Sequence, residues 1–143
     1  MTKILVATDG SPSADRAVDL AARIAADMRS ELIIVTAMQL VVDYDLEKFA
    51  QAEHTTTGDI LERDAAATLK RAQARAAKLG VTRVEALTKI GDPAEIILNL
   101  AKDIPADMVV MGKRGHGRLE GLLLGSVSQK SVSLAQCPVL VVP

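Results

Sequence analysis

The chain has 143 residues, of which 49% are hydrophobic but only one is Phe and one Tyr, so we expect one aliphatic core in a single domain spanning 1–143. The net charge of −1 provides no field to attract nucleic acid or an anionic membrane, and two aromatic rings offer little stacking surface for single strands. No apolar run approaches a membrane span, and Cys137 is the only cysteine, so we expect a cytoplasmic protein without an intrachain disulfide.

Short apolar runs alternate along the chain with amphipathic segments. Runs rich in Val, Ile and Leu are typical of strands, and apolar residues recurring every three or four positions are typical of helices. In chain order, strands are predicted at 3–9, 31–38, 81–90, 106–112 and 137–143, separated by helices at 14–28, 58–79, from 92 onward and at 126–135. The weakly periodic range 39–57 is expected to be a long connection with room for some helix.

Most of these strands are apolar continuously rather than at alternate positions. That pattern is expected when helices cover both faces of a sheet, which is the usual situation of parallel strands. The regular alternation of strand and helix therefore predicts an α/β fold with a mainly parallel sheet and right-handed crossovers.

Capping sequences mark several helix ends. Asp92 precedes Pro93 and lies three residues before Glu95, which is the arrangement of an N-cap followed by a capping-box carboxylate. Ser126 and Gln129 have the same capping-box spacing, and the Ser126 hydroxyl can cap the last helix, bond a phosphate oxygen or alternate between these two roles.

Ligands of open parallel sheets bind beyond the carboxyl ends of the strands. The residues that follow the predicted strands are therefore the candidates for a site. They are Asp9 and Gly10, Thr36 and Ala37, Ile90 to Asp92, and the loop that begins at Gly112.

Five of the nine glycines fall between 111 and 126, ahead of the last predicted helix. Glycines let backbone N–H groups approach a ligand, and a helix N-terminus adds unpaired donors and partial positive charge, so one interpretation is a phosphate cradle with Lys113 and Arg114 as cations. The other is a glycine-rich loop that only joins a strand to a capped helix. The spacing matches neither a Walker A loop nor a dinucleotide fingerprint.

Asp9 also has two interpretations. Its carboxylate can close the turn into the first helix, where Ser11 and Pro12 supply the helix start, or it can hold Mg²⁺ through water or bond a ribose hydroxyl. His116 has no second histidine near it in the sequence and is expected to be an exposed loop residue.

Four segments together resemble the ATP-binding subgroup of the universal stress protein family. They are "ILVATDGS", "GDPAEIIL", "MGKRGHGRLEGLLLGSVSQKSV" and "CPVLVVP". The most specific element is G-x-x-G, nine residues and G-S, which Gly112, Gly115, Gly125 and Ser126 provide. The resemblance implies an open five-stranded parallel sheet of order 3-2-1-4-5 with helices on both faces, the adenine nucleotide alpha hydrolase-like fold.

The resemblance also implies a binding site for ATP with Mg²⁺. Carried over by position, Thr8 and Asp9 contact the adenosine and metal sides, Ala37 recognises adenine through its main chain, and Ile90 or Gly91 lines the base pocket. The ribose and phosphate contacts fall on Gly112, Gly115, Gly125, Ser126 and Val127. Asp9 is the implied metal ligand.

The last strand is expected to be an apolar sheet edge, which would promote aggregation unless another surface covered it. Members of the family that this chain resembles pair their last strands across a two-fold axis. The resemblance therefore implies a homodimer through 138–142. No nucleic-acid or membrane partner is expected.

Three functional hypotheses follow. The first is a nucleotide-dependent regulatory dimer in a stress response, which is not an enzyme and acts on a regulatory protein partner that the sequence does not identify. The second is a slow ATP-hydrolysing or adenylyl-transferring enzyme on the same scaffold. The third is a dimeric interaction module that binds no nucleotide.

Overall fold

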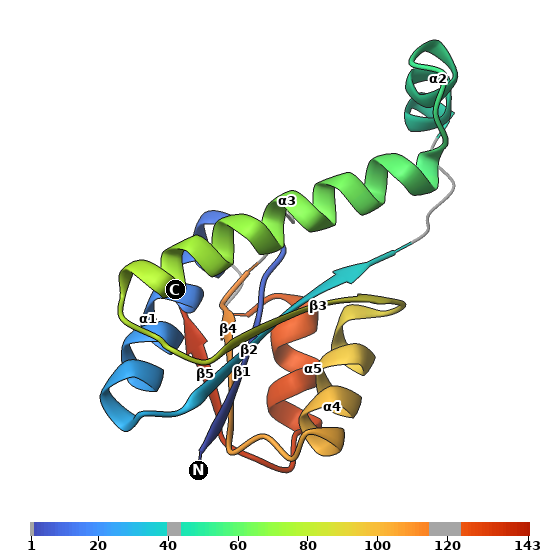
Figure 1. The fold of residues 1–143 in the computed structure, drawn as a ribbon. Coiled ribbons are helices and arrows are strands. Elements are labelled where there is room, and N and C mark those ends of the chain that lie inside the picture. Colours follow the sequence, from blue (N-terminus) through green and yellow to red (C-terminus); the bar gives the residue numbers. More distant parts are fainter. Residues whose placement is uncertain (1, 40–43, 115–123) are drawn as a thin grey trace.

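In the computed structural model, which describes residues 2–39, 44–114 and 124–143, five parallel strands form one sheet of order β3-β2-β1-β4-β5 (Figure 1). The strands are β1 (Lys3–Ala7), β2 (Glu31–Met38), β3 (Val84–Ile90), β4 (Met108–Gly112) and β5 (Val139–Val142). The order that the resemblance implied is confirmed, and β5 lies at an edge of the sheet as expected.

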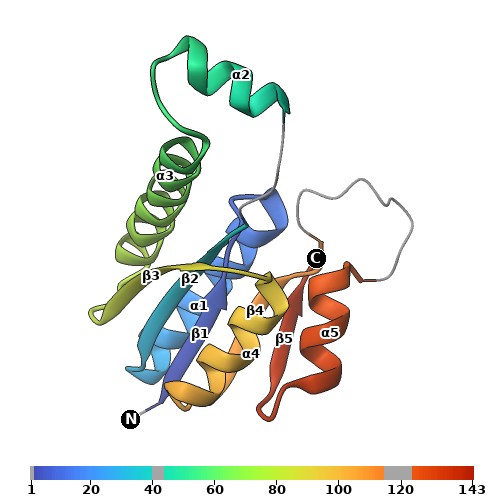
Figure 2. The ribbon, with the colours of Figure 1, turned by 90° about the vertical axis from the view of Figure 1, so that its right-hand side faces the viewer.

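Helices cover both faces of the sheet. The helices of the described residues are α1 (Pro12–Met28), α2 (Tyr44–Ala52), α3 (Thr57–Lys78), α4 (Pro93–Asp103) and α5 (Ser126–Leu134), and all but α2 pack on the sheet. Helices α1 and α3 pack on one face, and α4 and α5 lie side by side on the other (Figure 2). Among the described residues, no helix is both long and apolar enough to cross a bilayer.

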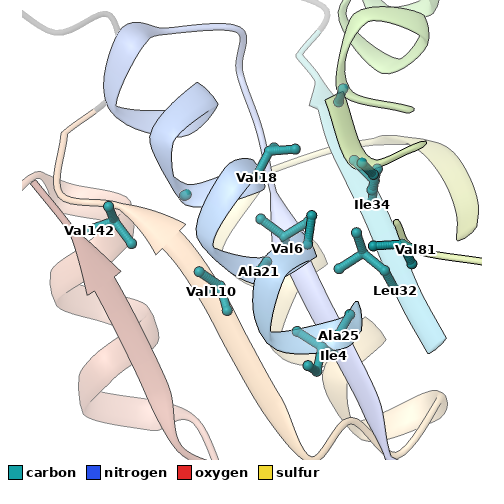
Figure 3. Packing of buried hydrophobic residues seen from close by; sticks show 14 of the residues in the cluster. Ile4, Val6, Val18, Ala21, Ala25, Leu32, Ile34, Val81, Val110 and Val142 are labelled. Carbon is teal, nitrogen blue, oxygen red and sulfur yellow. The ribbon is translucent and has the colours of Figure 1, made fainter. Parts of the chain in front are cut away.

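The two faces carry separate aliphatic cores, because successive residues of a strand point to opposite sides. In β1, Ile4 and Val6 belong to the core beneath α1 and α3, whereas Leu5 belongs to the core beneath α4. Figure 3 shows Val18 and Ala21 of α1 packed over the first of these cores. Burial on both faces explains why the strands are apolar without alternation.

Side chains cap two helices as the local sequence predicts. The Ala14 amide donates to Ser11 Oγ over 3.2 Å at the start of α1, and the Glu95 amide donates to Asp92 Oδ2 over 3.0 Å at the start of α4. Both helices have Pro in the first turn, where the missing N–H has no intrahelical partner.

The capping box predicted for the last helix is wrong. Gly125 is the N-cap of α5, and Ser126 is already the first helical residue. Within residues 2–39, 44–114 and 124–143 no side chain caps this helix, and Gln129 Nε2 donates instead to the carbonyl oxygen of Leu124 over 3.1 Å. The cause is a contact outside the helix: the Gly125 amide donates to the carbonyl oxygen of Lys113 over 2.9 Å, which places the helix start one residue earlier.

The range expected to be a connection contains α2. This helix lies beyond the far end of α3, away from the sheet (Figures 1 and 2). Its Tyr44 and Phe49 are exposed, and Ala50 is its one fully buried residue. This helix therefore adds little to the core of the domain.

Candidate functional site

The parallel strands β1 and β4 are neighbours at the point where the strand order reverses. The chain adds β2 and β3 on one side of β1 and then returns to add β4 and β5 on the other. From β1 the chain continues into α1 on one face, and after β4 it reaches α5 on the other. Such a switch point leaves a crevice beyond the carboxyl ends of the two strands, which is the usual ligand site of this architecture.

A hollow lies at this point, with about 620 Å³ of space when the adjoining solvent is included. Five of the residues carried over from the family resemblance line it, and so does Arg114, one of the two predicted cations. The five are Thr8, Asp9, Ala37, Gly112 and Val127. Apolar side chains from β2, β4 and α4 complete much of the wall, namely Val35, Met111, Ile96 and Ile97. A mostly apolar wall with a few polar groups at its mouth is typical of small-molecule sites.

The turn between β1 and α1 brings polar groups to the hollow. Thr8 is buried, and its Oγ1 accepts a hydrogen bond from the Gly10 amide over 3.1 Å. Asp9 is exposed, and its Oδ1 accepts from the Ser11 amide over 2.9 Å. The turn-closing interpretation of Asp9 is therefore confirmed, and the exposure of its carboxylate leaves this group accessible from the hollow.

Gly112, at the end of β4, lies against the first turn of α1. A Cβ at this position would come within 2.6 Å of Ser13 Oγ and 2.9 Å of the Ala14 nitrogen. Real Cβ atoms essentially never approach other atoms so closely. The absence of a side chain at Gly112 is thus required by packing within the protein, which the sequence interpretation of the glycines did not consider.

Ser13 joins three segments at this contact. Its Oγ donates to the carbonyl oxygen of Val142 and accepts from the Lys113 amide, each over 2.9 Å. The Lys113 amide also donates to Val142 O over 2.6 Å. The start of the glycine loop is therefore tied to both α1 and the end of β5.

The N-terminus of α5 faces the hollow, where Val127 and Ser128 contribute to its wall. Ser128 Oγ is within hydrogen-bonding distance of the carbonyl oxygens of Gly112 (2.9 Å) and Lys113 (3.0 Å), which holds the helix start against the end of β4. The N–H groups of a first helical turn have no partner inside the helix, and no side chain from the described part of the chain caps α5. Partial positive charge and donors are therefore directed toward the hollow.

The structure does not bring all predicted residues to this wall. Ile90 is 64% exposed, and neither it nor Gly91 lines the hollow. Gly125 and Ser126 begin α5 beside the hollow without lining it. Gly115 and His116 lie outside the described residues.

Sequence reasoning missed Ser128 and the contribution of α4. Ser128 lies inside a helix and has no motif spacing of its own, so no local signal marks it. Pro93 and Ile96 line the hollow because they lie in the first turns of α4, which begins beside it. The sequence interpretation used Pro93 only as a helix-start signal.

The hollow contains one cation and one carboxylate among its described lining residues. Arg114 follows β4, and Asp9 follows β1. No group of three or more metal-ligating side chains occurs in the part of the chain that the structure describes. A single carboxylate does fit Mg²⁺ that arrives with a polyphosphate, because this ion retains water and takes few protein ligands.

The cysteine lies elsewhere, just before β5. Partial burial of Cys137 raises the pKa of its thiol, and the negative charge of Asp107 contributes in the same direction. The thiol therefore remains protonated at neutral pH, an environment that disfavours a nucleophilic role.

The family model for universal stress proteins matches residues 1–143. The chain belongs to the universal stress protein family. A universal stress protein of Thermus aquaticus is 44% identical over 139 residues, covering 97% of this chain and 96% of that protein. Universal stress protein YxiE of Bacillus subtilis is 33% identical over 149 residues, covering 98% and 97% of the two chains. The resemblance drawn from the motifs is thus confirmed at the level of the family.

Solved structures agree with the fold. A universal stress protein in complex with cAMP has a TM-score of 0.75 and 32% identity, covering 99% of this chain and 97% of that one. Universal stress protein UspA from Lactobacillus plantarum has a TM-score of 0.81 at 24% identity, covering 99% and 97% of the two chains. Both are similar to this chain over nearly its whole length.

Proposed function

We propose that this universal stress protein binds ATP with Mg²⁺ in the hollow between β1 and β4 and acts as a nucleotide-dependent regulatory dimer. The observation that carries the proposal is the N-terminus of α5, whose N-cap Gly125 has no side chain. The helices α1, α3 and α4 are capped by the side chains of Ser11, Thr56 and Asp92, whereas no side chain of the described residues caps α5, and its Val127 and Ser128 line the hollow. An anion is the natural partner of such donors.

The rest of the wall suits the remaining parts of an adenine nucleotide. The apolar surface formed by Val35, Ile97 and Met111 can take a purine ring, with Ala37 beside it on β2. Arg114 provides positive charge for phosphates on the side of the glycine loop. The cAMP complex of a relative at 32% identity supports the choice of an adenine nucleotide.

Asp9 is the residue assigned to Mg²⁺. It is exposed at the mouth of the hollow, where its Oδ1 accepts the hydrogen bond from the Ser11 amide. The triphosphate and water would supply the other ligands, as is usual for Mg²⁺ held with a nucleotide.

We assign the protein a binding role rather than turnover, acting in the cytoplasm as one domain. If Asp9 holds the metal, the described lining residues provide no further carboxylate to serve as a general base. The alternative of slow hydrolysis or adenylyl transfer is tested by measuring phosphate and pyrophosphate release from ATP. Release that disappears in Asp9→Ala would favour the enzyme.

The dimer is proposed through 138–142, because β5 exposes one edge of the sheet. Its apolar residues Val139 to Val141 are only partly buried in the single chain. Edge pairing with a second copy would satisfy the free backbone groups and cover this surface. Sedimentation velocity across a concentration series tests the assignment, and a monomer throughout would refute it.

Calorimetric titration with ATP and with cAMP, each with Mg²⁺ and with EDTA, tests the binding proposal. Both ligands should bind. Only the affinity for ATP should depend on Mg²⁺ and on Asp9, because cAMP has no polyphosphate that could share a metal ion with the protein. Saturating ATP at 100 times its Kd should stabilise the fold by about 2.7 kcal/mol. If neither ATP nor cAMP bound, the proposal would be refuted, and an interaction module that binds no nucleotide would be favoured.

A further inference from the structure

Arg71 of α3 reaches across to the turn between β1 and α1. Its Nη2 donates to the carbonyl oxygen of Gly10 over 2.8 Å and to Asp15 Oδ1 over 3.0 Å. The arginine side chain is 51% exposed, so solvent screens this ion pair and its contribution to overall stability is small. Its effect on the geometry of the turn is a separate matter.

The carbonyl that Arg71 holds belongs to the same peptide unit as the amide of Ser11. That amide donates to Asp9 Oδ1 over 2.9 Å. Because a trans peptide is planar, its C=O and N–H point in opposite directions, and holding one fixes the direction of the other. Arg71 on one side of the peptide and Asp9 on the other therefore restrain its rotation together.

Gly10 gives this peptide unusual freedom. Its φ is +79°, a conformation that glycine adopts without steric penalty, so nothing in the residue itself prevents the turn from adopting other states. The Gly10 amide is held by Thr8 Oγ1, but this bond does not fix the carbonyl side of the residue. The bond from Arg71 supplies that restraint.

The geometry points to Arg71 as a positioning residue for the nucleotide site, acting on the Asp9 carboxylate through the Gly10–Ser11 peptide. This inference rests on the proposed binding of ATP with Mg²⁺ by Asp9. Lysine is a poor substitute, because the ammonium is a compact, mobile charge, whereas the planar guanidinium presents fixed donors to the carbonyl and to Asp15 together.

Arg75 provides a matched control one helical turn further along α3. It pairs with both carboxylate oxygens of Asp19, with Nε–Oδ1 at 2.9 Å and Nη2–Oδ2 at 2.8 Å. Its pKa is raised chiefly by the hydrogen bond with Asp19. Arg75→Ala therefore removes a comparable link between α3 and α1 and leaves the bond to Gly10 in place.

The experiment compares Arg71→Ala, Arg71→Lys and Arg75→Ala by calorimetric titration with ATP and Mg²⁺. Arg71→Ala should weaken binding about five- to tenfold, the scale of one partly screened charged hydrogen bond. Arg71→Lys should recover only part of that loss, and Arg75→Ala should stay within about twofold of the parent protein. Equal effects of the two alanine variants would overturn the inference.

A double-mutant cycle with Asp9→Ala shows whether Arg71 acts through Asp9. The effect of Arg71→Ala should disappear when Asp9 is already absent, and an additive loss would overturn the inference. Hydrogen exchange of the Ser11 amide without nucleotide gives a second readout, which should accelerate in Arg71→Ala and not in Arg75→Ala. If the parent protein binds no adenine nucleotide, the proposed function fails, and an unchanged Ser11 exchange would independently overturn the positioning role.

Discussion

Substitution of Gly112 by alanine should destabilise the protein even when no nucleotide is present. The added Cβ would lie 2.6 Å from Ser13 Oγ and 2.9 Å from two backbone atoms, Ser13 C and the Ala14 nitrogen. Rotation of the Ser13 side chain relieves only the first contact, so the end of β4 or the first turn of α1 must move. Overpacking of this kind costs about 1–3 kcal/mol.

The displacement also disturbs the bonds of Ser13. Its Oγ bonds Val142 O and the Lys113 amide, and each such bond contributes about 0.5–1.5 kcal/mol. The expected total is about 2–6 kcal/mol, which lowers the Tm of a chain of this length by roughly 7–20 °C.

Differential scanning calorimetry of ligand-free protein measures this loss. Gly58→Ala is the matched control, because Gly58 lies within α3 and its Cβ would meet only Thr56 Oγ1, at 3.9 Å. Alanine favours the helix there, so the control should be neutral or stabilised by up to about 1 kcal/mol. A Gly112→Ala protein whose Tm equals that of the parent would show that packing does not require the glycine.

Three further outcomes are expected. The free energy of unfolding should fall as pH rises above about 8.5, because burial raises the folded-state pKa of Cys137 and the unfolded chain loses the thiol proton first. Urea unfolding from pH 7 to 10 should show this decline, and Cys137→Ser should reduce it. Asp92→Ala should cost about 1 kcal/mol in chemical denaturation, since the Glu95 amide loses its cap, and an unchanged midpoint would contradict the capping role. Gly125→Val should abolish binding of ATP, because the larger side chain crowds the start of α5. Circular dichroism should stay nearly unchanged, because a Cβ at this position meets Lys113 O at a tolerable 3.4 Å. Retained affinity for ATP would remove this helix start from the site.

Local chemistry was enough to predict most of the fold. The starts of α1 and α4 were predicted correctly because Ser11 and Asp92 each bond an amide three residues away, within the reach of a sequence pattern. The strands were recognised from continuous apolar runs, although 81–83 and 106–107 lie outside β3 and β4. Such ends depend on which neighbouring strand is available for pairing.

The candidate site was predicted in part. The rule that ligands bind beyond the carboxyl ends of parallel strands selected Asp9, Ala37 and Gly112, and all three line the hollow. The same rule selected Ile90, which is the last residue of the edge strand β3 and is exposed to solvent instead. Ile90 differs from the other three residues in its greater distance from the switch point between β1 and β4. That distance is set by the order of the strands in the sheet.

Residue pattern alone was sufficient for the family, the order of helices and strands, and most helix starts, because each of these depends on neighbours within a few positions. Assembly of the chain was needed to find the contact of Gly112 with Ser13, the start of α5 at Gly125 and the bond from Arg71 to Gly10. Each of these joins residues from separate elements, and a short-range pattern contains no information about which distant backbone atom will lie within hydrogen-bonding distance.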